Sequence, residues 1–175
     1  GGAVARNLSI DSVSNTITLN GANSGELNAW ALNTNSITAA RSQAASVTAN
    51  GYVYIIGGTA NGTAGNTTTY YAKLNADGST GAFASTTAIP ANRFRAAATY
   101  SNGYIYVLGG YDGTSYQNTV YYGLLDSTTG AVGAFTTNAN NITANRAGHS
   151  SVVANGKVYV IGGFDGTNRV STIYY

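Results

Sequence analysis

The chain has 175 residues, of which 8% are charged, and its formal net charge is +2. An average soluble domain is about one quarter charged, so this surface is rich in amides and hydroxyls instead. So small and scattered a charge excludes the basic stripe that phosphate neutralisation requires, and nucleic acid is not an expected partner. The absence of cysteine excludes disulfides, thiolate metal sites and a cysteine nucleophile. No apolar run approaches the roughly 18 residues that a spanning helix needs, and no membrane span is predicted.

A repeat organises the sequence. Glycine pairs close three aliphatic runs, at Gly57-Gly58, Gly109-Gly110 and Gly162-Gly163, so the copies are 52 and then 53 residues apart. An arginine keeps the same phase, because Arg41, Arg93 and Arg146 each precede the first glycine of a pair by 16 residues. Such a period indicates one supersecondary unit repeated along the chain.

The residues before Arg41 match the second half of this unit. Thr16-Ile17-Thr18 falls where later units have a tyrosine pair, and Trp30 falls where they have a phenylalanine. We therefore predict a single domain over residues 1–175. It consists of a partial unit (1–40), two full units (41–92 and 93–145) and a second partial unit (146–175).

The first two strands of each unit form a hairpin. Small-sided strands are expected at Ala45–Thr48, Ala97–Tyr100 and Ser150–Val153, and each runs into an Asn-Gly pair. Asn-Gly between two apolar runs is the strongest short-range hairpin signal, because both central residues of a type I′ turn need positive φ. The second strand, as in Val53–Ile56, is apolar on both faces and fits between neighbouring sheets.

The second half of the unit contributes two more strands. A tyrosine pair marks the third, at Tyr70-Tyr71, Tyr121-Tyr122 and Tyr174-Tyr175, and one large aromatic, Phe83 or Phe135, marks the fourth. No segment shows a useful apolar period of 3.6 residues, so no helix is expected. The prediction is an all-β protein of four-stranded antiparallel units, the pattern of propeller blades.

The order of these residues resembles the Kelch repeat. Arginine, a small-residue strand, Asn-Gly, an aliphatic strand closing on Gly-Gly, then tyrosine and finally tryptophan or phenylalanine recur over essentially the whole chain. The match is closest from Asn145-Arg146 to Gly163-Phe164-Asp165-Gly166. The resemblance, which extends to bacterial-type Kelch-like surface proteins, implies a β-propeller with the first strand near the axis and the fourth at the rim.

The number of blades leaves three alternatives open. Closed propellers have about four to eight blades, whereas this sequence supplies about three and a third. The chain is either a fragment of a longer propeller, or one of several copies that self-associate head to tail into a ring. In the third alternative its amino-terminal strands complete the last blade and close a four-bladed ring.

The sequence predicts no catalytic or metal chemistry. His149 is the only histidine, which excludes a multi-histidine site, and we expect it to be structural. The carboxylates fall in loops, and the repeated ones lie on different blades, which does not suit a glycosidase pair. We interpret Asp112-Gly113-Thr114 and Asp165-Gly166-Thr167 as turns rather than calcium loops. The prediction is a protein that is not an enzyme and that needs no cofactor.

Residues that recur in phase are assigned to the scaffold. We expect the arginines to bond carbonyl groups between blades, and the glycine pairs to let the backbone pass close to the neighbouring blade. The in-phase scaffold residues are Arg41, Arg93, Arg146, Gly57, Gly58, Gly109, Gly110, Gly162, Gly163, Trp30, Phe83 and Phe135.

Residues that do not recur are the candidates for binding, because repeats share a scaffold and vary at their loops. They lie in the loops after the glycine pairs and at one blade junction: Arg95, Tyr111, Asp112, Tyr116, Phe164, Asp165, Asn168 and Arg169. We expect a non-enzymatic module of an extracellular or cell-surface protein that binds a protein or a glycan. The alternatives are a scaffold segment of a larger propeller enzyme and an intracellular adaptor that binds a peptide.

Overall fold

The computed structural model describes residues 31–175, so the expected strand at Thr16–Thr18 and the aromatic Trp30 lie outside the described residues. The chain divides into two units, and the second is Thr34–Tyr175. The fold described below is that of the second unit.

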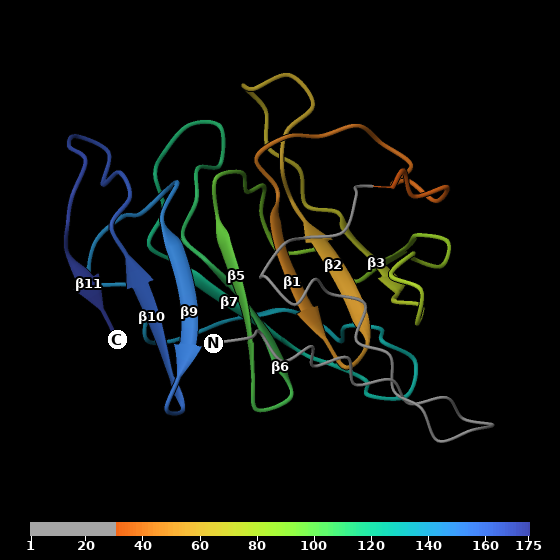
Figure 1. The fold of residues 1–175 in the computed structure, drawn as a ribbon. Helices are drawn as coiled ribbons and strands as arrows, with labels where there is room; N and C mark the ends of the chain where they lie inside the picture. The colour runs from red at the N-terminus through yellow and green to blue at the C-terminus, as the bar shows by residue number, and fades with distance from the viewer. Residues whose placement is uncertain (1–30) are drawn as a thin grey trace, which may run out of the picture. The chain divides into compact units, whose positions relative to one another are not determined.

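The second unit is built from β-strands, and the described residues contain no helix. Three antiparallel sheets follow one another along the chain (Figure 1), and we call them the first, second and third blades. The first blade is β1 (Ala45–Ala49), β2 (Tyr52–Ile56), β3 (Thr69–Lys73) and β4 (Ala84–Thr86). The second is β5 (Ala97–Ser101), β6 (Tyr104–Leu108), β7 (Val120–Leu124) and β8 (Thr136–Thr137). The third is β9 (Ser150–Ala154), β10 (Lys157–Ile161) and β11 (Ile173–Tyr174).

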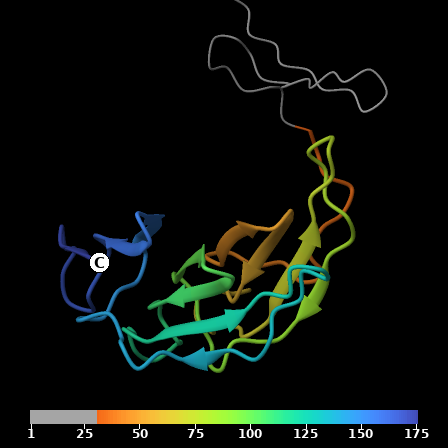
Figure 2. The same ribbon diagram turned by 90° about the horizontal axis from the view of Figure 1, so that it is seen from below.

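Strand order in each blade follows the sequence, so every strand pairs with the next one. β1 contacts β5, and β5 contacts β9, which places the first strands of successive blades side by side. Figure 2 shows the three sheets following one another face to face. The all-β architecture of four-stranded antiparallel blades predicted from the repeat is confirmed.

Hairpins form at the Asn-Gly pairs. Asn50 has φ 47° and Gly51 has φ 77°, and the pairs at 102–103 and 155–156 adopt the same left-handed conformation. The strands before the turns extend one residue further than the sequence indicates, because the β1–β2 ladder reaches the pair Ala49 and Tyr52.

The aromatic residues expected within the fourth strands lie just before them. Phe83 and Phe135 directly precede β4 and β8. The β7–β8 ladder begins only where Thr136 pairs with Tyr122. Phe135 packs on the core between the first two blades instead.

Glycine pairs at the ends of β2 and β6 bring successive blades into contact. The Gly58 N–H donates to the carbonyl oxygen of Arg93 at 2.8 Å, and the Gly110 N–H donates to that of Arg146 at 2.7 Å. A β-carbon on Gly57 would overlap the same Arg93 oxygen. The backbone of the next blade therefore occupies the volume that a side chain would need.

The in-phase arginine side chains bond within their own blades. The Nη2 of Arg93 donates to the Thr119 hydroxyl at 2.7 Å and to the Tyr121 hydroxyl at 2.9 Å. Arg146 bonds the hydroxyl of Tyr174 at 3.1 Å in the same way, and each guanidinium lies 5.0 Å from the centre of its tyrosine ring.

Arg41 differs slightly, since its Nη1 donates to the carbonyl of Gly57 at 2.7 Å, again in its own blade. The expected bridge between blades is thus made by the arginine backbone and not by its guanidinium. Each arginine side chain instead links the connector before the first strand of its blade to the third strand of the same blade.

Two apolar clusters fill the spaces between blades. The cluster between the first and second blades comprises Ala45, Ala49, Tyr54, Ile56, Ile89, Ile105, Val107, Tyr121, Leu125 and Val132. The cluster between the second and third blades is smaller and comprises Leu108, Val120, Ile142 and Val160. Tyr54 is fully buried in the first cluster, where its hydroxyl donates to the Gly130 carbonyl at 2.7 Å, and burial raises its pKa.

Candidate binding cavity

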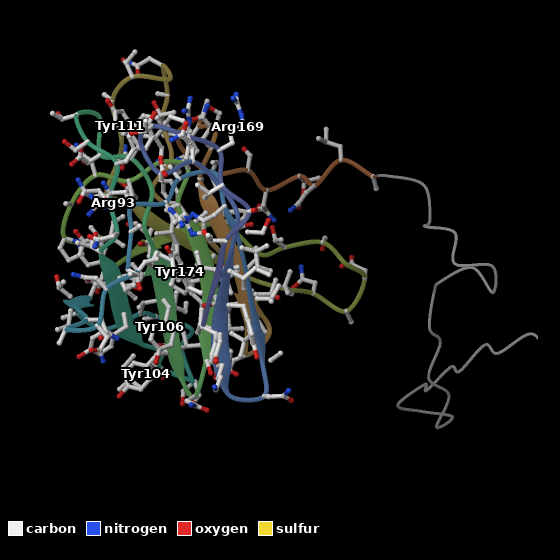
Figure 3. All side chains as sticks on the ribbon, turned by 90° about the vertical axis from the view of Figure 1, so that its left-hand side faces the viewer. Arg93, Tyr104, Tyr106, Tyr111, Arg169 and Tyr174 are labelled. Atoms are coloured by element: carbon white, nitrogen blue, oxygen red, sulfur yellow. The ribbon has the colours of Figure 1, made fainter. Side chains whose placement is uncertain are left out.

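The blades have two ends of different character. At the hairpin end lie the Asn-Gly turns, and at the loop end lie the loops that follow the glycine pairs (59–66, 111–116 and 164–169). Figure 3 shows Tyr111 and Arg169 together at the loop end and Tyr104 at the opposite end. The residues that the sequence predicts for binding all lie at the loop end. Seven of them are in these loops, and Arg95 lies where the connector between the first and second blades reaches the same end.

A cavity of about 530 Å³ opens at the loop end, between the second and third blades. This volume is within the usual range of about 300–1,000 Å³ for ligand sites. Both blades supply its walls, which are formed by Arg95, Tyr116, Ala147, Gly148, Gly163, Phe164, Arg169 and Val170.

A row of aromatic rings leads into the cavity. Phe94 packs edge-on against Tyr111 with 5.3 Å between ring centres, and Tyr111 lies 4.6 Å from Tyr116. Tyr116 in turn packs edge-on against Phe164 of the third blade at 5.0 Å. Because each ring is braced by the next, the row holds the loops of two blades in fixed positions with an aromatic wall toward the cavity.

Arg95 is positioned by the first blade. Its backbone has φ 56°, its N–H donates to the Gln43 carbonyl at 2.9 Å, and its own carbonyl accepts from Gly148 N–H at 2.8 Å. The side chain of Arg95 also bonds Gln43, because its Nε–H donates to Oε1 of Gln43 at 2.9 Å. The guanidinium is therefore held at the cavity by a residue of a different blade.

One residue of the cavity wall lacks a side chain at a repeated position. Gln43, Arg95 and Gly148 each follow an in-phase arginine by two residues, and their φ angles are 56°, 56° and 61°. A β-carbon built on Gly148 would meet no atom within 4 Å. The third blade thus leaves open the space that Gln43 and Arg95 occupy in the first two.

The charged groups of the cavity wall are both cationic. Arg95 and Arg169 line the cavity, and none of the lining residues is a carboxylate. Within residues 31–175, no hydrogen bond or ion pair engages the exposed Arg169 guanidinium, and the terminal nitrogens of Arg95 make none either. The cavity is therefore electropositive and retains unused donors.

Nearby carboxylates are used by their own loops. Oδ1 of Asp112 accepts from the backbone N–H groups of Thr114 and Ser115, both at 2.7 Å. Burial alone would raise the pKa of Asp112, but these bonds and the nearby Arg93 lower it below its ordinary value. Asp165 forms the same turn, which lowers its pKa as well.

The structure thus separates the eight candidate residues into two groups. Arg95, Tyr116, Phe164 and Arg169 line the cavity. Tyr111 supports Tyr116 from behind, while Asp112, Asp165 and Asn168 shape the loops. Sequence reasoning missed Gly148, although aligning it with Gln43 and Arg95 would have revealed the lost side chain.

His149 does not belong to the cavity wall. The residue is 8% exposed, and neither ring nitrogen has a hydrogen-bond partner among the described residues. Burial, with a smaller contribution from Arg146, lowers its pKa to about 4. Over residues 31–175, no three side chains of the His, Cys, Asp or Glu type come together as a possible metal site. Among the same residues, no helix long and apolar enough to cross a membrane is found.

Comparison with known proteins assigns the repeat. The family model for the Kelch-repeats domain of KLHDC2, KLHL20 and DRC7 matches residues 1–175. The chain belongs to the Kelch-repeat family. A solved structure described as "Structure of YjhT" matches with 25% identity and a TM-score of 0.58. The match covers 72% of this chain and 35% of YjhT, so this Kelch segment spans about one third of the length of that protein. No curated protein matches the sequence.

Proposed function

We propose that this Kelch segment is a non-enzymatic binding module that holds a protein partner at the loop end. The observation that carries the proposal is the cavity of about 530 Å³ between the second and third blades. Its walls present tyrosine, phenylalanine and arginine, and Tyr and Arg are among the types that dominate binding energy in protein interfaces. Membership of the Kelch-repeat family supports the same role.

The chemistry of the described residues favours binding over catalysis. A general acid–base pair needs titratable groups that converge on one point. Here Asp112 and Asp165 are engaged by their own turns, and His149 is buried and does not line the cavity. The cavity has shape, aromatic surface and positive charge, which suffice for recognition.

A peptide array tests this proposal. The full chain is screened beside two variants of the cavity wall, Tyr116→Ala and Arg169→Ala. Matched controls at the hairpin end are Tyr104→Ala and Lys157→Ala, which remove an aromatic ring and a positive charge far from the cavity. We expect the two wall variants to lose binding and the two controls to retain it, with thermal unfolding showing that all four are folded.

Two outcomes would contradict the proposal. Equal loss from wall and control variants would place binding elsewhere on the segment. A response only to a neutral glycan array, with no peptide bound, would replace the protein partner with a carbohydrate.

We also propose an extracellular or cell-surface location. The support is the composition, in which charged residues are sparse and small, hydroxyl and amide side chains are abundant. Labelling of intact cells with a membrane-impermeant reagent tests it, and the proposal fails if the protein reacts only after lysis.

A further inference from the structure

We infer that a second cavity between the second and third blades, of about 290 Å³, docks an extended segment of a partner protein that adds a fourth strand to the third blade. The segment carries a glycine, an aliphatic residue two positions later and an aromatic residue five positions later. This cavity shares no lining residue with the loop-end cavity, so the inference is independent of the proposed function. Three observations carry it: a filled equivalent site, unused polar groups in the cavity and a free strand edge.

The first observation is that the chain fills the equivalent site at the junction of the first and second blades. There, residues 130–137 of the second blade carry the pattern, with Gly130, Val132 and Phe135 at its three positions. Val132 is 2% exposed within the apolar cluster, and Phe135 packs against that cluster. The segment ends in β8, which pairs with β7. A strand of this pattern therefore fits between two blades of this chain.

Two side chains of the first blade bond the backbone of that segment. The Tyr54 hydroxyl donates to the Gly130 carbonyl at 2.7 Å. The Thr86 hydroxyl oxygen accepts from the Val132 N–H at 2.9 Å, and the hydroxyl donates to the Val132 carbonyl at 3.3 Å. Because these bonds engage only main-chain groups, they would hold any segment that follows the same path.

The second observation is that both polar positions recur 52 residues later and line the 290 Å³ cavity. Tyr106 takes the place of Tyr54, and Asn138 takes the place of Thr86. Asn138 accepts the Asn140 N–H through Oδ1 at 2.8 Å. Among the described residues, neither its amide nitrogen nor the Tyr106 hydroxyl has a hydrogen-bond partner. The cavity thus presents unused donors where the first junction bonds a backbone.

The rest of the wall is apolar. Leu108 and Val120 of the second blade face Val158 and Val160 of the third across the cavity, and none of the described residues that line it is charged. An aliphatic side chain is the complementary group here, as Val132 is at the first junction. A charged side chain at that place would lose its hydration without a counter-charge.

The third observation is a free strand edge beside the cavity. β3 pairs with β4 and β7 with β8, whereas β11 pairs only with β10 among the described residues (Figure 1). At the start of β7, the Val120 carbonyl accepts the Asn138 N–H at 2.8 Å. Ile173 occupies the same place in β11 and is 57% exposed. An unpaired edge is a template for another strand, which gains main-chain hydrogen bonds when it adds there.

The probe is a capped peptide with the sequence of residues 126–140, and titration calorimetry measures its binding to the full chain. Three altered peptides each change one feature: Gly130→Ala, Val132→Asp, and an N-methyl group on the backbone nitrogen of Asn138. The matched control carries its N-methyl group on Thr137 instead. The Thr137 N–H points away from the paired strand, because backbone groups alternate in direction along a strand.

We expect the parent and control peptides to bind equally and the three altered peptides to bind at least about fivefold more weakly. Gly130 has φ 74°, which disfavours alanine. The aspartate brings a charge to an apolar wall, and methylation at Asn138 removes a ladder hydrogen bond.

A matched pair of protein variants locates the site. Tyr106→Phe should weaken binding roughly three- to tenfold, because it removes one donor. Tyr159→Phe should not, since Val158 and Val160 line the cavity and the side chain between them lies on the other face of β10. Thermal unfolding shows whether both variants are folded.

Four results would overturn the inference. The first is that the parent peptide does not bind, and the second is that all the peptides bind equally. The third is that Tyr106→Phe and Tyr159→Phe have the same effect. The fourth is that the full chain sediments as a dimer that the parent peptide does not dissociate, in which case a second copy occupies the site.

Discussion

The two junctions between blades use the same scaffold and differ in how they are filled. At the junction of the first and second blades, Val132 and Phe135 of the second blade's outer half cover the apolar cluster, and Tyr54 bonds the turn at Gly130. At the junction of the second and third blades, a cavity of about 290 Å³ lies beside Tyr106 and Val160. The same backbone hydrogen bonds thus link the blades at both junctions, while the apolar filling differs.

The loop end shows the same contrast. Gln43 and Arg95 link the first two blades through both backbone and side chain. Gly148 continues the backbone link but contributes no side chain, and the 530 Å³ cavity lies at this point. The cavity thus lies where a repeated position lacks a side chain while its backbone conformation is kept.

The largest expected difference in stability is between alanine at a glycine that contacts the next blade, Gly109, and alanine at the equivalent glycine that does not, Gly162. On Gly109, a β-carbon would overlap the Arg146 carbonyl oxygen, whereas on Gly162 the closest atom is the Val170 oxygen at 3.2 Å. Both glycines have positive φ, which costs an alanine roughly 1–2 kcal/mol. Overpacking adds roughly 1–3 kcal/mol at Gly109 only.

Gly109→Ala should therefore destabilise the protein by about 4 kcal/mol and Gly162→Ala by about 1 kcal/mol. Urea unfolding of the two variants measures the difference. Equal losses would show that backbone conformation, and not the approach of the next blade, requires these glycines.

Truncation of the two cores compares the junctions directly. Ile105 is fully buried in the sealed cluster, and Leu108 borders the 290 Å³ cavity. Removing a large aliphatic side chain costs roughly 2–5 kcal/mol, depending on the void that is left. We expect Ile105→Ala near the top of that range and Leu108→Ala near its bottom, because a cavity already adjoins Leu108. Denaturant midpoints test the order, and the reverse order would mean that the second junction is the better packed.

Acid should destabilise the junction that contains His149. In the unfolded chain the imidazole gains its proton near pH 6.5, but burial delays this to about pH 4 in the folded chain. The unfolded state therefore binds the extra proton between these values, and the free energy of unfolding falls as the pH drops from 6.5 to 4. The full change is about 3 kcal/mol.

The same position is Ala44 in the first blade and Ala96 in the second, so His149→Ala is the natural control. Its unfolding free energy should stay nearly constant from pH 6.5 to about 5 and fall far less than that of the wild type by pH 4, where only the carboxylates with lowered pKa begin to contribute, as followed by urea unfolding at several pH values. A variant that keeps the acid sensitivity would assign it to another group.

The sequence predicted what depends on a single unit and missed what depends on its neighbour. Asn50-Gly51 and its copies specify their hairpins locally, through residues that adopt positive φ, and the 52-residue period places them in equivalent strands. The Gln43–Arg95 contact depends on how adjacent blades are placed. A period in one chain carries no information on that placement. Of the candidate site, the residue types Arg, Tyr and Phe were predicted, and the lost side chain at Gly148 was readable from the repeat, but the cavity between the two blades was not.

The smallest expected effect comes from one hydroxyl group on each junction. Tyr54 and Tyr106 are 52 residues apart and occupy the same place in β2 and β6. The Tyr54 hydroxyl donates to the buried carbonyl of Gly130 at 2.7 Å. Tyr106 lines the 290 Å³ cavity, and its hydroxyl has no hydrogen-bond partner among the described residues.

Tyr54→Phe should cost about 1–2 kcal/mol, because it leaves the Gly130 carbonyl buried without its donor. Tyr106→Phe should change the free energy of unfolding by less than about 0.5 kcal/mol. Both variants keep the ring, so a difference between them isolates the bond to the neighbouring turn. A cost at Tyr106 equal to that at Tyr54 would show that its hydroxyl is also hydrogen-bonded in solution.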